Sequence, residues 1–128
     1  MPGFFSCTYG ELPHTVYGSI SKTDCGIVLQ IYGGTQEHVG SVVISTPGPA
    51  SWNPDRLYAT SSVHNLPSHK DEVIAREAAE KAALIFNVPV VCVAGLHIDS
   101  AAKTDIDALV HNAGAVLSQL LESQPRED

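Results

Sequence analysis

Six histidines in 128 residues are the first chemical feature of this chain, since all Lys and Arg together number seven. Neutral imidazoles from His38, His69 or His97 could bind a divalent metal together with a carboxylate from Asp99 or Asp71. The grouping has no local spacing signature such as H-E-x-x-H. The metal set we expect is therefore His38, His69, His97 and Asp99.

Two lysines point to an anion. Lys70 lies in the first turn of one predicted helix and Lys103 just before another, where the positive end of the helix dipole disfavours cations. A bound phosphate would remove this conflict, because helix N-termini present free N–H groups. Ser68 is the expected N-cap of the first helix. The alternative is a solvated Lys70 offset by neighbouring carboxylates.

Other residues have a structural interpretation beside a functional one. Trp52, the one tryptophan, could stack on a flat ligand or close one end of the core. Cys92 lies in an apolar run and is expected to be an inert core thiol. We interpret His14 as a strand residue and His111 as a polar residue on a helix face, and His64 stays undecided.

The elements that must position these residues follow from hydrophobic periodicity. The segment 47–54 is expected to be a loop, because prolines cannot donate to a strand ladder. Capping boxes are expected from Ser68 with Asp71 and from Thr104 with Asp107. Strands are predicted at 14–20, 27–32, 38–44, about 57–64 and 88–95, and helices at 70–86 and 105–122.

This order, β-β-β-β-α-β-α, predicts an α+β fold. We expect a single-domain two-layer α/β sandwich, with a mixed, mostly antiparallel sheet of about five strands and both helices on one face. The domain spans 1–128, with an ordered core at about 10–123 and a frayed tail at 124–128. The apolar residues on the other sheet face must also be buried. Homo-oligomerisation is the simplest way to do this, and we expect a dimer.

The predicted topology brings the three histidines together. The strand ending near His64, the helix after it and the strand at 88–95 form a βαβ unit, whose parallel strands end at the same edge. If the strand that opens at His38 pairs antiparallel with the strand before the helix, it begins at that edge too. We therefore expect His38, His69 and His97 at one site.

Charge and composition exclude several partners. Fourteen acidic against seven basic residues give a net charge of −7, which disfavours nucleic acids and anionic membranes. The start lacks the pattern of a signal peptide and no apolar run is long enough for a membrane helix, so we expect a cytoplasmic protein. Three cysteines without C-x-x-C spacing indicate neither a disulfide framework nor a zinc ribbon.

At these same residues the sequence resembles a known family. It is similar, over about residues 14–121, to the small D-subunit proteins of UbiD-type decarboxylases such as gallate decarboxylase, a family described as prenylated-flavin chaperones. The motifs that carry the resemblance are Gly33-Gly34, His38-Val39-Gly40, Ser61-Ser62-Val63, His69-Lys70-Asp71-Glu72, Val93-Ala94-Gly95-Leu96-His97-Ile98-Asp99 and Asn112.

The resemblance implies an accessory role rather than catalysis. Such a protein binds prenylated FMN, or FMN, from a flavin prenyltransferase, protects or matures it, and delivers it to a UbiD-type decarboxylase. The resemblance carries over to His38, His69, Lys70, Asp71, His97 and Asp99. Together with the anion and stacking arguments, the expected cofactor-binding set is His38, Trp52, Ser68, His69, Lys70, His97, Asp99 and Lys103.

Two alternatives stay open. The clustered histidines could serve a small metal-dependent hydrolase or lyase, with Asp99 or Asp71 as general base. The chain could also be a structural subunit of a decarboxylase complex, with no ligand of its own. No catalytic residue is assigned.

Overall fold

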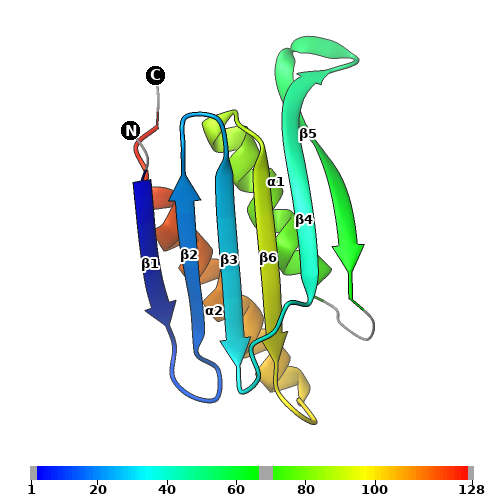
Figure 1. Ribbon diagram of the computed structural model, residues 1–128. Helices are drawn as coiled ribbons and strands as arrows, with labels where there is room; N and C mark the ends of the chain where they lie inside the picture. Colours follow the sequence, from blue (N-terminus) through cyan, green and yellow to red (C-terminus); the bar gives the residue numbers. More distant parts are fainter. Residues whose placement is uncertain (1–2, 67–70, 127–128) are drawn as a thin grey trace.

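The computed structural model describes residues 3–66 and 71–126, which form one six-stranded sheet with two helices behind it (Figure 1). The predicted residues Ser68, His69 and Lys70 lie outside the described residues. The elements are β1 (Gly3–Tyr9), β2 (Val16–Lys22), β3 (Ile27–Gly34), β4 (Ser41–Ala50), β5 (Asn53–Asn65), α1 (Glu72–Phe86), β6 (Val90–His97) and α2 (Lys103–Glu122).

The strand order in the sheet is β1-β2-β3-β6-β4-β5. The central pair β3 and β6 runs parallel, while the other neighbouring strands run antiparallel. Both helices lie on the same face, α2 behind β1 to β3 and α1 behind β6, β4 and β5 (Figure 1). The structure thus confirms the α+β sandwich, with six strands where about five were predicted.

The additional strand is β1, which the sequence pattern did not reveal. It forms one edge of the sheet, and most of its side chains are exposed, so its sequence shows no clean alternation of apolar and polar residues. Phe4 and Phe5 stand side by side in it, on opposite faces of the sheet. Cys7 faces α2, where its thiol contacts the carbonyl oxygen of Val116 at 3.9 Å.

The expectation of a loop at 47–54 was wrong for most of that segment. β4 continues to Ala50, and both its prolines pair with β5, Pro47 opposite Ala59 and Pro49 opposite Leu57. β4 pairs with β6 only as far as Ser45, so the prolines lie where one side of β4 has no strand beside it. A proline is tolerated there because its missing N–H can face the free side.

The starts of both helices also differ from prediction. The N-cap of α1 is Asp71, whose carboxylate makes no cap hydrogen bond, and helix α2 begins two residues earlier than expected, after Ala102. The carboxylate of Asp105 accepts the backbone N–H of Ala102 at 2.9 Å. The predicted capping box of Thr104 with Asp107 was therefore wrong. In the other predicted box, Asp71 is itself the N-cap and not the residue three positions after it, while Ser68 lies outside the described residues.

The core fills the space between the sheet and the helices. Small residues of α1 and larger ones of α2 pack on the inner positions of the strands, among which Ile20, Leu29, Ile31, Val43 and Cys92 are completely buried. The buried Cys92 agrees with the sequence prediction. Within the described residues, neither helix is long and apolar enough to cross a membrane.

The chain remains packed slightly past α2. Gln124, placed in the predicted frayed tail, is only 7% exposed and donates a hydrogen bond to the Ser123 hydroxyl at 3.1 Å. A side chain on Gly3 would collide with it, since a Cβ there would lie 2.2 Å from its Oε1. The C-terminal segment thus packs against the start of β1.

Candidate functional site

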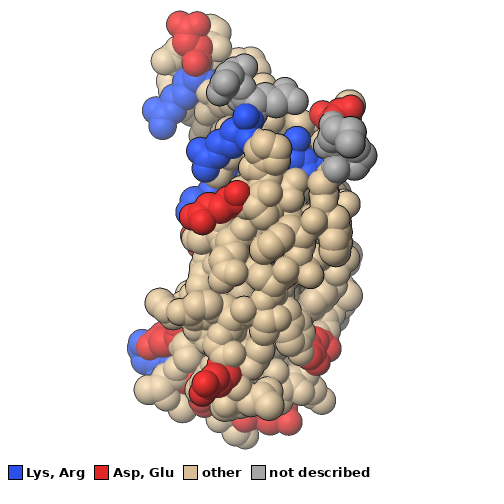
Figure 2. Space-filling model, turned by 90° about the vertical axis from the view of Figure 1, so that its left-hand side faces the viewer, with Lys and Arg blue, Asp and Glu red and all other residues tan. Residues whose placement is uncertain are grey.

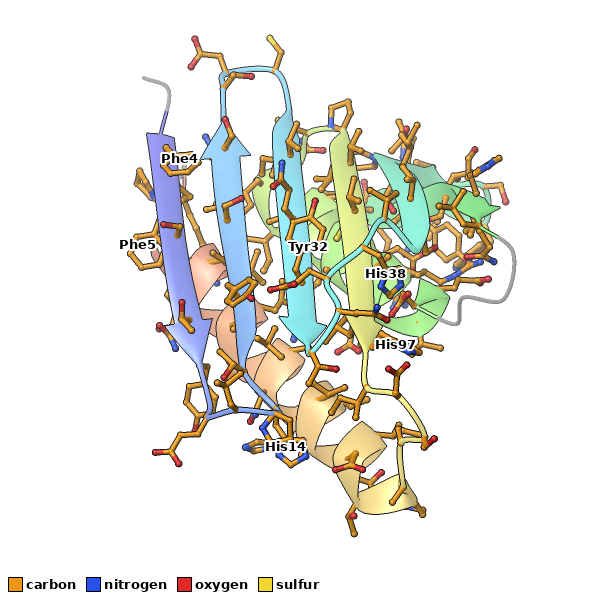
Figure 3. All side chains as sticks on the ribbon, turned by 60° about the horizontal axis from the view of Figure 1, so that its bottom comes forward. Phe4, Phe5, His14, Tyr32, His38 and His97 are labelled. Atoms are coloured by element: carbon orange, nitrogen blue, oxygen red, sulfur yellow. The ribbon has the colours of Figure 1, made fainter. Side chains whose placement is uncertain are left out.

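The site lies where β3 and β6 end. Gly34 pairs with His97 at the carboxyl ends of these parallel strands, and both helices begin at the same end of the molecule (Figure 1). The loop 35–40 crosses this edge before β4 begins. Figure 3 shows His38 and His97 near each other there, with ring centroids 6.1 Å apart and ring planes at 77°. The predicted convergence of these two histidines is therefore observed.

His38 is held by two acceptors. Its Nε2 lies 3.2 Å from Oδ2 of Asp71, and its Nδ1 lies 3.1 Å from the carbonyl oxygen of Gln36. The other carboxylate oxygen of Asp71 accepts the backbone N–H of Leu96 at 3.0 Å. Asp71 is only 6% exposed. One buried carboxylate thus fixes the orientation of His38 and binds it to the end of β6.

His97 is more accessible. Its Nε2 lies 2.8 Å from the Oδ1 of Asp99, and the two side chains are 42% and 81% exposed. Its backbone is fixed more firmly than its ring, because its carbonyl oxygen accepts the N–H of Thr35 at 2.9 Å. A ligand can therefore replace Asp99 as the hydrogen-bond partner of His97 at little cost in free energy. His38 differs, because its partner Asp71 is buried.

Three glycines make this close packing possible. A Cβ on Gly95 would lie 1.6 Å from the carbonyl oxygen of His38, and one on Gly40 would lie 2.0 Å from Oδ2 of Asp71. Gly34 has a φ of +82°, and a Cβ there would lie 2.1 Å from the carbonyl oxygen of His97. The loop 35–40 can lie against β6 only because these positions carry no side chain.

A pocket of about 460 Å³ opens beside the histidines, on the helix side of the sheet. Its walls come from the first turns of α1 and α2 and from the end of β6 with the segment after it, and most are aliphatic. Asp71, His97 and Ser100 supply polar groups. The full lining is Asp71, Ile74, Leu96, His97, Ile98, Ser100, Ala101, Ile106, Leu109 and Val110.

Sequence reasoning missed the apolar part of this pocket. Ile106, Leu109 and Val110 lie on the apolar stripe of α2, which by itself predicts only a helix packed on the sheet. Ile106 and Val110 are each 52% exposed, so near the start of α2 the apolar stripe extends beyond the part of the helix that packs in the core. An apolar excess in the first turns of a helix was the signal that could have indicated the pocket.

Lys103, expected to bind an anion, has a carboxylate partner on its own helix. Its side chain is 87% exposed, and its Nζ donates to Oδ2 of Asp107 at 2.8 Å, a hydrogen bond that raises the pKa of the lysine. The carboxylate of Asp105 already caps the N-terminus of α2. The conflict between Lys103 and the helix dipole is therefore offset by two carboxylates of α2 itself.

Trp52 is not brought to the histidines. It lies in the turn between β4 and β5, is 64% exposed, and meets Tyr58 edge to face with ring centroids 5.3 Å apart. This turn follows the last residue of β4, whereas His38 precedes its first residue. A ten-residue strand separates them, roughly 30 Å at the rise of an extended chain. Trp52 therefore cannot stack on a ligand held by His97.

The expected metal set is not assembled. In the ranges 3–66 and 71–126, no group of three or more His, Cys, Asp or Glu side chains has the geometry to hold a metal ion. His38 and His97 each contact a carboxylate of their own, Asp71 and Asp99. A divalent metal is thus not supported by the described residues. His69, the remaining member of the set, lies outside them.

The other three histidines lie apart from the site. His14 is in the turn before β2 rather than in a strand; its Nε2 lies 2.8 Å from Oδ1 of Asp105, and its carbonyl oxygen accepts an N–H of Asn112 (Figure 3). His111 lies on α2 with its ring beside that of Tyr9. His64 is exposed on β5, on the sheet face away from the helices.

Comparison with known proteins places this geometry in context. The model of a family described as "Prenylated flavin chaperone LpdD-like domain" matches residues 10–124. No curated protein matches the chain. One similar solved structure is described as "Crystal Structure of a Novel Chaperone Complex for Yeast 20S Proteasome Assembly". It has a TM-score of 0.58 and 17% identity, with 94% of this chain and 93% of that chain covered, and the likeness concerns the fold alone.

Proposed function

Since the chain belongs to the family of LpdD-like prenylated-flavin chaperones, we propose that it binds prenylated FMN in the pocket beside His97 and delivers it to a UbiD-type decarboxylase. The observation that carries the proposal is the composition of this pocket. Aliphatic walls from both helices meet His97 and Asp71 at its polar side. The ligand needs both kinds of surface.

Prenylated FMN combines three chemical parts. The benzenoid end of the flavin and its added isoprenoid ring are apolar, the pyrimidine end carries hydrogen-bonding carbonyl and imide groups, and the ribityl chain ends in a phosphate. The apolar part fits against Ile74, Ile106 and Leu109. The pyrimidine end then meets His97, whose ring can exchange its exposed partner Asp99 for a ligand acceptor.

The phosphate calls for a cation or free N–H groups. Lys103 is paired with Asp107, so we assign the phosphate to Lys70, which directly precedes the pocket residue Asp71 in sequence. Ser68 and His69, the residues before Lys70, complete the proposed set. His38 has a positioning role. It contacts Asp71, which accepts the N–H of Leu96, and Leu96 directly precedes His97 in β6.

The proposed role is that of a carrier. The chain receives the cofactor from a flavin prenyltransferase in the cytoplasm, shields its reactive ring in the pocket, and passes it to the decarboxylase. Both encounters are transient. We also propose that the carrier works as a homodimer.

Co-expression with a flavin prenyltransferase tests the binding step. The purified chain should carry a flavin that is visible in its absorbance spectrum, with the mass of prenylated FMN after release. Ala101→Trp, which fills the pocket, should abolish retention, and His97→Asn should weaken it. Leu84→Trp, at an exposed position of α1 away from the pocket, is the matched control and should retain the ligand.

Two results would overturn the binding proposal: wild-type protein that never retains flavin, or Ala101→Trp protein that retains as much as wild type. Delivery is tested separately, by mixing loaded protein with cofactor-free decarboxylase. Activity should appear faster than with the same concentration of free cofactor. Equal rates would contradict the delivery role and leave the binding result intact.

A further inference from the structure

We infer that the sheet face opposite the helices is the surface through which two copies of this chain associate. Strand register aligns the outward side chains of this face in rows that cross the sheet. Two rows span all six strands, and a third spans β1 to β3 and ends where the loop 35–40 covers Gly95. They are Phe4, Ser21, Val28, Val91, Ile44 and Ser62; then Ser6, Ser19, Gln30, Val93, Val42 and His64; then Thr8, Tyr17 and Tyr32.

None of the residues in these three rows is Lys, Arg, Asp or Glu. The centre is aliphatic, because Val28, Val91 and Ile44 lie side by side on β3, β6 and β4, and serines flank it on β2 and β5. Phe4 is 71% exposed, and Val28 and Ile44 are 44% and 46% exposed. An uncharged sheet face with an aliphatic, partly exposed centre and no helix over it is typical of an interaction surface.

Charged side chains lie elsewhere on the molecule. Figure 2, which views the β1 edge, shows them mainly toward the two ends of the molecule, with an uncharged band across the middle. Glu37, at the border of the face, is held by the hydroxyl of Tyr17. Two copies that each carry a net charge of −7 repel one another least when they meet through this uncharged face.

The uncharged sheet face fits a second copy of this chain as its binding partner. A two-fold interface places one patch against itself, so the patch must be self-complementary, and an uncharged face of valine, isoleucine and serine meets that condition. Six strands about 4.8 Å apart and about seven residues long give roughly 670 Å² in projection. This approaches the ~800 Å² per partner of a standard interface.

A dimer formed through the sheet face leaves the proposed flavin pocket accessible. Two sheets packed face to face, roughly 10 Å apart, leave the helices on the outside. The pocket lined by Ile74 and Ile106 lies on the helix side, so it stays open in the dimer. The inference specifies the surface of the proposed homodimer, and it does not depend on flavin binding.

Sedimentation equilibrium of the flavin-free protein, at about 1 to 100 µM, tests the inference. The wild-type mass should be twice 13.6 kDa. Ile44→Glu and Gln30→Glu should each weaken dimerisation by about a hundredfold or more, because both place like charges opposite one another. Gln30→Glu keeps the size of the side chain and so carries little risk to folding. Val73→Glu, 73% exposed on the helix side, should leave the dimer unchanged.

Circular dichroism confirms that each variant is folded before its mass is interpreted. A wild-type monomer over the whole range would overturn both the homodimer and this surface, and would leave the sheet face to a different protein. A dimer that neither Ile44→Glu nor Gln30→Glu weakens would overturn the surface alone. Neither result bears on flavin retention, so the two proposals fail separately.

Discussion

Asp71 lies at a distance of 3.2 Å from His38, and this contact joins parts of the chain that are far apart in sequence. The same carboxylate binds the backbone of Leu96, so the loop before β4, the start of α1 and the end of β6 meet at one buried group. Two of these three segments, the start of α1 and the end of β6, line the pocket, so part of its wall depends on a single side chain.

Removal of Asp71 should therefore destabilise the fold. We expect Asp71→Ala to lower the free energy of unfolding by roughly 1–3 kcal/mol, because the N–H of Leu96 loses its acceptor. Asp71→Asn should cost less, since the amide oxygen can still accept that hydrogen bond. Urea denaturation measures both. Asp99→Ala, at an 81% exposed side chain, is the control and should change stability by less than about 0.5 kcal/mol.

Alanine in place of Gly95 should disturb the same region. Its Cβ would collide with the carbonyl of His38, so the loop 35–40 must move, at a cost of roughly 1–3 kcal/mol, with weaker flavin retention. Gly114→Ala is the matched control, because nothing beyond its chain neighbours and the backbone of its own helix lies within 4 Å of the added methyl. That change should stabilise α2 by about 0.5–1 kcal/mol. Similar melting temperatures for the two variants would contradict the close approach.

Stability should depend on pH through Asp105. Its hydrogen bond from His14 is the main cause of a pKa lowered below the usual 3.8, with a further contribution from the N–H of Ala102. The ionised group therefore stabilises the fold above that usual value, and this contribution is lost as the pH falls through the lowered pKa. Asp105→Asn should be less stable than wild type at pH 7, with the difference shrinking below about pH 4. Thermal melts at both pH values measure this, and a gap that widens on acidification would contradict it.

The three thiols should react at different rates. Burial raises the pKa of Cys92 to about 12 and also raises that of Cys7, whereas Cys25 is exposed in the turn between β2 and β3. A thiol-specific reagent at pH 8 should label Cys25 rapidly, Cys7 slowly, and Cys92 only after denaturation. Mass spectrometry of the labelled peptides identifies each site. Rapid labelling of Cys92 in the native protein would show that the core opens.

Strong periodicity made most of the fold predictable. The stripe of α2 and the apolar run of β6 placed both elements, and the rule for crossover connections brought His38 and His97 to one edge. The edge strand β1 and the prolines of β4 were not predictable in this way. Edge positions are buried on one side at most, so their sequences follow neither alternation nor the exclusion of proline that holds inside a sheet.

The details of the site depended on contacts between distant residues. No local pattern shows that Asp71 faces His38 instead of capping α1, or that Asp107 pairs with Lys103. Trp52 was assigned to the site by its chemical type, and only the length of β4 shows that it lies at the far end. Spacing identified the edge at which the site forms, whereas tertiary packing decided which side chains meet there.

The position of β6 between β3 and β4 has a consequence for synthesis on the ribosome. β3 and β4 follow one another in sequence, yet neither can complete its central pairing until the residues up to His97 have emerged. Until then the nascent chain holds a three-stranded meander, β1 to β3, and a separate hairpin, β4 and β5, each with an unpaired inner edge. Such edges are sites of mispairing between chains, so the late arrival of one strand sets the interval during which this small protein is most prone to aggregate.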